Sequence, residues 1–172
     1  MGKSNKSAKR SAPLYTNEER QRRDESHWTV VQGILAPLQF LVFLISLGLV
    51  INTLVTGNGM EAATASIILK TLILYTIMIT GAIWEKVVFG QYLFAPSFFW
   101  EDVVSMAVIA LHTAYLLCWL MNIGTPVQQL WVALAAYATY VINAAQFLHK
   151  LRLARRHDPS ANLALAQQGG YR

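Results

Sequence analysis

The stretch LVFLISLGLV, residues 41–50, has Ser46 as its only polar side chain. A helix on the surface of a soluble bundle would carry a polar stripe, and this stretch leaves almost none. A second stretch, IILKTLILYTIMI at residues 67–79, is similar, with Lys70 as its only charge. Apolar runs of this kind are typical of helices that cross a membrane.

Four apolar segments are each long enough to cross the roughly 30 Å of bilayer hydrocarbon as a helix. They cover residues 30–54, 62–88, 102–121 and 127–148. Short separators with turn residues join them, at residues 56–59, 90–96 and 122–126. Because short connections make consecutive helices antiparallel neighbours, the sequence predicts an all-α polytopic membrane protein, an antiparallel bundle of four transmembrane helices.

The charges lie mainly in the two tails. Seven of the fourteen Lys and Arg residues precede Trp28, and five occur from Lys150 onward. The turns around Gly57 and Gly124 carry none, whereas the middle connection has Lys86. By the positive-inside rule, both termini and the middle connection should face the cytoplasm. This placement of charge argues against nucleic-acid binding.

The chain divides into three predicted parts. Residues 1–27 form a polar, basic N-terminal tail, in which Thr16 and Glu19 have the spacing of a capping box and predict a short helix. Residues 28–156 form the four-helix transmembrane domain, and residues 157–172 a flexible C-terminal tail. Cys118 is the only cysteine, so no disulfide or cysteine-based metal site is expected. No nucleotide-binding loop, HExxH, CxxC or GxSxG motif is present.

Several polar side chains lie inside the apolar segments. A central Asp, Lys or Arg costs about 2.5 to 3.5 kcal/mol there, so each one needs a partner or a function. With the predicted orientation, most lie toward the cytoplasmic half, and they come from all four helices: Gln32, Gln39, Glu85, Lys86, Glu101, Asp102, His112, Asn143 and Gln146. This convergence predicts a polar pocket on the cytoplasmic side.

Each of these residues also has a simpler explanation. The four charges near segment ends could be ordinary interface charges. Asn143 and Gln146 could stabilise packing between helices rich in alanine. His112 could form a hydrogen bond between helices as readily as it could bind a ligand. Lys70, in the middle of the second segment, has no evident partner.

Long runs of the sequence carry a family resemblance. These runs are APLYTNEER (12–20), RDES (23–26), QGILAPLQFLVF (32–43), IWEKVVFG (83–90), YLFAP (92–96) and FFWEDVVS (98–105). They closely resemble the 3-vinyl (bacterio)chlorophyllide hydratase family of phototrophic bacteria, and the resemblance covers about residues 12–156. It implies addition of water to the C3 vinyl group of a chlorophyllide, which gives a 3-(1-hydroxyethyl) product on the route to bacteriochlorophyll.

The resemblance also implies a substrate, a location in the cell and candidate partners. The substrate is a chlorophyllide-type tetrapyrrole that carries its own Mg, and no redox cofactor is implied. The expected location is the bacterial inner membrane, cytoplasmic or intracytoplasmic and photosynthetic, with the lipid bilayer and other pigment-biosynthesis enzymes as candidate partners. The alternative is a non-catalytic pigment-binding or assembly subunit of a photosynthetic membrane complex. A small transporter is less favoured, because no inverted repeat is visible.

A vinyl hydration needs a proton donor and a placed water. Glu101 and Asp102 are therefore predicted as the acid/base region, with Glu85 next. His112 lies eleven residues after Glu101 on nearly the same helical face, about 16 Å along the axis, so the two would meet different parts of one macrocycle. The predicted substrate-binding side chains are His112, Lys86, Gln39, Asn143 and Gln146. No protein metal site is predicted.

Overall fold

The computed structural model describes residues 14–156, and these form five α-helices. The helices are α1 (Asn17–Glu25), α2 (His27–Thr56), α3 (Met60–Phe89), α4 (Phe99–Leu120) and α5 (Pro126–Arg156). Four of them, α2 to α5, are long and apolar enough to cross a membrane, judged by length and composition. The predicted all-helical class and the four predicted membrane-length segments are confirmed.

The helices extend beyond the apolar segments because local signals set their ends. Helix α2 begins at His27, where the Ser26 side chain accepts a hydrogen bond from the backbone N–H of Trp28. It ends at Gly57, whose φ of 75° is readily adopted only by a residue without a Cβ. Pro37 lies inside α2. Proline is tolerated in membrane helices because neighbouring groups can satisfy the freed carbonyl.

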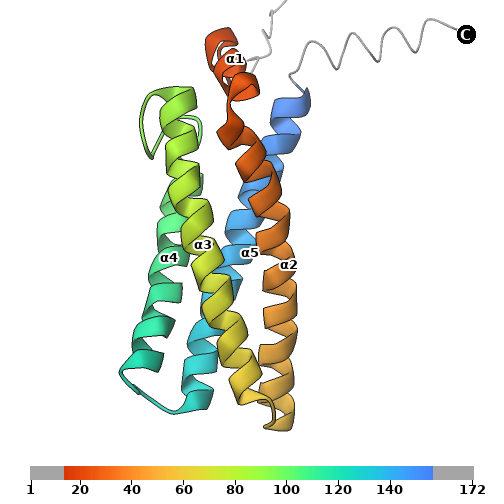
Figure 1. The fold of residues 1–172 in the computed structure, drawn as a ribbon, viewed down its shortest axis with the longest axis vertical. Coiled ribbons are helices and arrows are strands. Elements are labelled where there is room, and N and C mark those ends of the chain that lie inside the picture. Colours follow the sequence, from red (N-terminus) through yellow and green to blue (C-terminus); the bar gives the residue numbers. More distant parts are fainter. Residues whose placement is uncertain (1–13, 157–172) are drawn as a thin grey trace, which may run out of the picture.

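The bundle consists of two helix pairs (Figure 1). The closest backbone approaches occur within α2–α3 and within α4–α5. Helix α1, the 90–98 loop and the C-terminal end of α5 lie at one end of the bundle, called here the tail end, at the top of Figure 1. The turns at residues 57–59 and 121–125 lie at the opposite end, the turn end.

The core between the pairs combines aromatic rings with a hydroxyl cluster. Phe43 packs edge-on against Tyr137 and also contacts Tyr140. The Ser46 hydroxyl is hydrogen-bonded to the Tyr137 hydroxyl at 2.5 Å and to the Ser66 hydroxyl at 2.7 Å, which links α2, α3 and α5. Many large apolar side chains face outward instead. An apolar outer surface around a partly polar interior suits a protein that packs against lipid.

The short N-terminal helix confirms the predicted capping box. Thr16 Oγ accepts from the Glu19 N–H at 3.2 Å, and the Glu19 carboxylate accepts from the Thr16 N–H at 2.8 Å. The predicted C-terminal tail, residues 157–172, lies outside the described residues.

Candidate functional site

Three carboxyl side chains lie together at the tail end of the bundle. Glu85 is in the last turn of α3 and is 5% exposed, whereas Glu101 and Asp102 are in the first turn of α4 and are 7% and 3% exposed. Buried groups of this kind are not the solvated interface charges of the simpler explanation. Buried carboxyl groups need hydrogen bonds or opposite charges, and the three satisfy this need in different ways.

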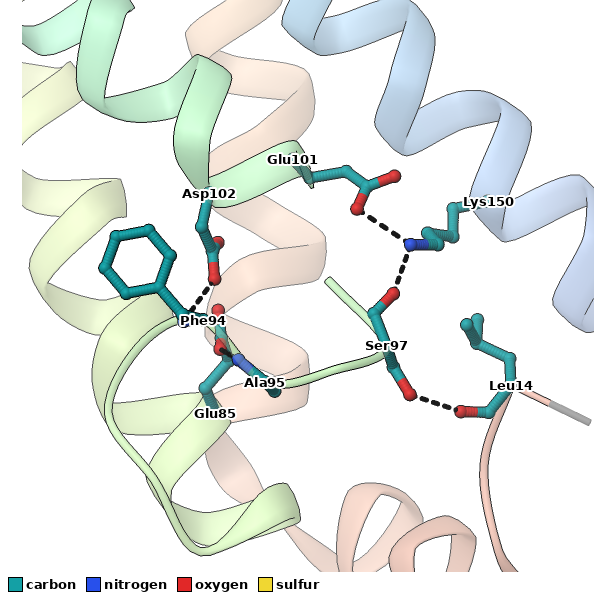
Figure 2. A network of polar contacts seen from close by, with 8 residues as sticks. All are labelled: Leu14, Glu85, Phe94, Ala95, Ser97, Glu101, Asp102 and Lys150. Atoms are coloured by element: carbon teal, nitrogen blue, oxygen red, sulfur yellow. Dashed lines mark hydrogen bonds and ion pairs between the residues drawn. The ribbon is translucent and has the colours of Figure 1, made fainter. Parts of the chain in front are cut away.

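Asp102 and Glu85 are held by two successive backbone amides (Figure 2). The Phe94 N–H donates to Asp102 Oδ2 at 2.6 Å, and the Ala95 N–H donates to Glu85 Oε2 at 3.3 Å. The two carboxyl groups also lie close enough to interact with each other. Because two negative charges close together in a buried place repel each other, this arrangement favours the state in which one of the two carries a proton. We call Glu85 and Asp102 the acid pair.

The 90–98 loop places these amides through an unusual backbone conformation. Phe94 has φ 59°, in the left-handed region that bulky residues rarely adopt. Such a conformation costs about 1–3 kcal/mol and persists only where the surroundings hold it. Here the hydrogen bond to Asp102 and a ring contact with Phe99, at 5.8 Å between centroids, hold it. The loop geometry therefore belongs to the site.

Glu101 has a different partner. Its Oε2 lies 2.7 Å from Lys150 Nζ on α5, and Lys150 also donates to the backbone carbonyl of Ser97. The ion pair joins α4, α5 and the loop, as Figure 2 shows. Sequence reasoning counted Lys150 only as a tail charge. Helix register could have indicated this pairing, because Glu101 and Lys150 lie at similar distances along the chain on either side of the 121–125 turn.

The N-terminal segment covers the loop. Ser97 Oγ donates to the Leu14 carbonyl at 2.9 Å, and the Tyr15 ring stacks on Phe89 at 5.7 Å between centroids. Burial raises the pKa of the Tyr15 phenol, while the nearby Arg23 guanidinium lowers it in part. The phenol therefore stays neutral and acts as a packing ring. Residues 14 and 15, which we call the N-terminal strap, thus contribute to the tail end.

A second polar layer lies deeper in the bundle. The Asn143 amide donates to Ser105 Oγ at 2.8 Å. His112 Nδ1 is 2.8 Å from the Val108 carbonyl, and since a carbonyl only accepts, Nδ1 carries a hydrogen; in the neutral ring Nε2 then keeps its lone pair. Within residues 14–156, buried polar atoms without a hydrogen-bond partner include Gln39 Oε1 and Nε2, Lys70 Nζ, His112 Nε2, Asn143 Oδ1 and Gln146 Oε1. Unpaired buried groups are expensive, which marks this layer as a place for a ligand or water.

Two other predicted residues lie apart from this layer. Lys86 is exposed, donates to the Gly90 carbonyl at 2.7 Å and lies 5.4 Å from the centroid of the Tyr92 ring. Lys86 therefore forms its hydrogen bond at the C-terminal end of α3 and is not part of the second polar layer. Gln32 donates to Thr80 Oγ1 at 2.7 Å and ties α2 to α3.

A cavity at the turn end does not compete with this site. It has a volume of about 220 Å³, and its lining includes Met60, Thr64, Tyr115 and Trp119 but no carboxyl side chain. Its place at the end opposite the acid pair separates it from the acid–base groups.

Membrane-length apolar helices around two adjacent buried carboxyl groups define a class, namely small polytopic membrane proteins with a buried site suited to acid–base chemistry. Residues 15–153 match the family described as 2-vinyl bacteriochlorophyllide hydratase (BCHF). The chain belongs to this family, which confirms the resemblance seen in the sequence.

Two curated relatives carry the family's name. The 2-vinyl bacteriochlorophyllide hydratase of Cereibacter sphaeroides is 72% identical over 143 residues, which cover 83% of this chain and 88% of the relative. That of Rhodobacter capsulatus is 71% identical over 143 residues, covering 83% of this chain and 82% of the relative. No solved structure matches the chain.

Proposed function

We propose that this protein adds water to the vinyl group of a bacteriochlorophyllide-type pigment, a step of bacteriochlorophyll biosynthesis. The family and the names of the two relatives support this activity. The structural observation that supports it is the acid pair, two adjacent buried carboxyl groups that we propose share one proton. Hydration of a double bond moves no net electrons, so the reaction needs no redox cofactor. The substrate's own Mg would be the metal present.

The proposed chemistry is acid-catalysed addition. The acid pair donates its proton to the terminal vinyl carbon, which breaks the π bond and forms a C–H bond. Positive charge then develops on the carbon beside the ring, where the conjugated macrocycle and the nearby carboxylate stabilise it. Water adds to this carbon to form the C–O bond, and its extra proton returns to the acid pair. One water is consumed, and the pair ends as it began.

The contacts of the site support a division of roles among the predicted residues. Asp102 and Glu85 act as the acid/base groups, whereas Glu101, ion-paired with Lys150, positions the start of α4. The free lone pair of His112 Nε2 orients the pigment, through its Mg or through a water molecule. The amides of Gln39, Asn143 and Gln146 offer further hydrogen bonds to ring substituents. For Lys86, no contact in the polar layer supports a binding role.

The orientation in the membrane is part of the same proposal. The four membrane-length helices form an antiparallel bundle in the bacterial inner membrane, with both termini and the acid pair toward the cytoplasm. The Lys and Arg residues of the tails and of the middle connection support this orientation. Other pigment-biosynthesis enzymes, which would supply the vinyl pigment and take the hydrated product, are candidate partners.

Replacing each carboxyl group of the acid pair with an amide of the same shape tests whether the pair transfers the proton. Asp102→Asn and Glu85→Gln should each lower kcat by about 10²- to 10⁴-fold, because an amide cannot donate the proton or take it back. Glu101→Gln should act more mildly. Purified protein is incubated with the vinyl pigment, and the product is followed as a compound heavier by one water, with absorption shifted to the blue because the vinyl group leaves conjugation.

Pigment binding and membrane level are measured for each variant. Near-normal turnover by both Asp102→Asn and Glu85→Gln would contradict carboxylate catalysis. If the wild-type protein co-purified with vinyl pigment and left it unchanged, the pigment-binding alternative would be favoured.

A further inference from the structure

Lys70 is a buried amine that the proposed chemistry does not use. It lies on α3 in the interior of the bundle and is 0% exposed. Its Nζ lies 3.6 Å from the centroid of the Tyr140 ring. Within residues 14–156, the amine has no hydrogen-bond partner and no ion-pair partner.

The contact with Tyr140 does not compensate for this burial. A cation over an aromatic face gains about 0.5–2 kcal/mol. Removing an ammonium from water costs several kcal/mol even after relaxation, and a neutral amine would still lack its hydrogen bonds. The Lys70 amine in the interior of the bundle therefore lacks a partner that would compensate for its burial. A carboxylate arriving with a ligand would supply one.

The surroundings of Lys70 contain other unpaired polar atoms. His112 is near enough to Lys70 for a charge on the amine to act on the imidazole, and its Nε2 has no partner among the described residues. Gln39 lies one helical turn from Phe43, which contacts Tyr140, and neither of its amide atoms is paired within residues 14–156. Helices α2, α3 and α4 thus each direct an unsatisfied polar group into the interior.

The space between the helix pairs is filled by long side chains. Phe43 reaches Tyr137 and Tyr140, and Lys70 reaches Tyr140, whereas close backbone contact is concentrated within each pair. Long side chains can change rotamer, so this region can open for a flat ligand more easily than the seam inside either pair.

We propose that Lys70 binds the carboxylate of the pigment's propionate side chain and so selects the unesterified pigment. This inference rests on the proposed function, because the ending of the relatives' substrate name denotes a pigment whose propionate is free. Ten residues of α4, about 15 Å, separate His112 from Asp102. On α3, fifteen residues, about 22 Å along the axis, separate Lys70 from Glu85, and the long lysine side chain can cover part of this distance. In the proposed binding mode an extended ligand covers the rest, with its vinyl group at the acid pair and its carboxylate at Lys70.

The test compares two pigments that differ only at the propionate. Full-length protein in detergent is titrated with the vinyl pigment as the free acid and as its methyl ester, and binding is followed by pigment absorption. The wild type should bind the acid about 10- to 100-fold more tightly than the ester, the range expected for a hydrogen bond to a charged group. Lys70→Met should bind the two pigments within about twofold of each other, since only the amine distinguishes them.

A matched control separates the amine from packing. Tyr75→Phe, on the same helix, removes a hydrogen bond of 2.7 Å to Thr113 and leaves the amine in place, so its preference for the acid should equal that of the wild type. In turnover, Lys70→Met should raise KM for the acid more than it lowers kcat, and Lys70→Arg should keep part of the preference.

Three results would overturn the inference: equal binding of acid and ester by the wild type, a wild-type preference in Lys70→Met, or loss of the preference in Tyr75→Phe. If Lys70→Met did not accumulate, the wild-type ratio together with that of Lys70→Arg would decide. Failure of the hydratase proposal would look different, because the wild type would then form no hydrated product from either pigment.

Discussion

At the scale of single residues, Glu101 and Asp102 show how adjacent carboxylates acquire different roles. Successive residues of a helix point about 100° apart. Glu101 therefore faces α5 and meets Lys150, while Asp102 faces α3 and meets Glu85. One carboxylate is neutralised by a cation, and the other lies against a second carboxyl group with which we propose it shares a proton. Only the second arrangement leaves a proton available for transfer.

The ion pair can be tested by a double-mutant cycle. Lys150→Met leaves Glu101 buried without its cation and should destabilise the protein by about 1–3 kcal/mol. Adding Glu101→Gln to this variant should recover part of the loss, because no buried charge is left over. Thermal unfolding in detergent measures the stability of the single variants and of the double variant. If the two changes added without coupling, the pair would contribute nothing beyond the separate side chains.

At the scale of elements, the 90–98 loop positions the acid pair although it contributes neither carboxyl group. It supplies the amides of Phe94 and Ala95 and the carbonyl of Ser97, and it contacts α3, α4, α5 and the N-terminal strap. The conformation of this loop decides whether the two carboxyl groups stay together.

Phe94 offers a test of the loop with two substitutions that remove the same ring. Phe94→Gly relieves the cost of a positive φ, whereas Phe94→Ala keeps a Cβ in the left-handed region. The glycine variant should be more stable than the alanine variant by about 1 kcal/mol and should retain more hydratase activity. Unfolding temperature and turnover are compared directly. Equal behaviour would mean that the loop relaxes to another conformation once the ring is lost.

The same loop marks the limit of prediction from sequence. The membrane-length helices were predictable because hydropathy and turn residues act locally, as at residues 41–50 and Gly57. The capping box of Thr16 and Glu19 was predictable for the same reason. The pairing of Lys150 with Glu101, and the two amides on the acid pair, depend on helix register and on one unusual φ. No local pattern encodes these contacts.

At the scale of the whole molecule, the described chain begins and ends at the same end of the bundle, together with the acid pair. Four long helices that each crossed the membrane would bring the chain back to the side on which it started. In the proposed orientation, which rests on the positive charges of the tails, that side faces the cytoplasm, and water and protons reach the acid pair from there.

Cysteine labelling tests this orientation. In a Cys118→Ala background, Asn58→Cys should react with an impermeant maleimide added from the periplasmic side, because residue 58 lies in a turn at the opposite end. Ser7→Cys and Ala161→Cys should react only after the membrane is opened. Opposite accessibility of the two tails would contradict an even number of crossings, and the side assigned to the acid pair would then be wrong.

The N-terminal strap has a consequence for biosynthesis of the protein itself. Tyr15 leaves the ribosome before any of the long helices, yet it packs on Phe89 and Phe98, and Phe98 in turn stacks on Phe147 near the end of α5. The first described residues therefore cannot dock before α3 and the 90–98 loop have been made, and Phe147 of α5 completes the cluster of rings. Lys150, which holds Glu101, also arrives only with that helix. A nascent or truncated chain that ends before α5 thus contains both residues of the acid pair but lacks the cation that pairs with Glu101 and the ring of Phe147.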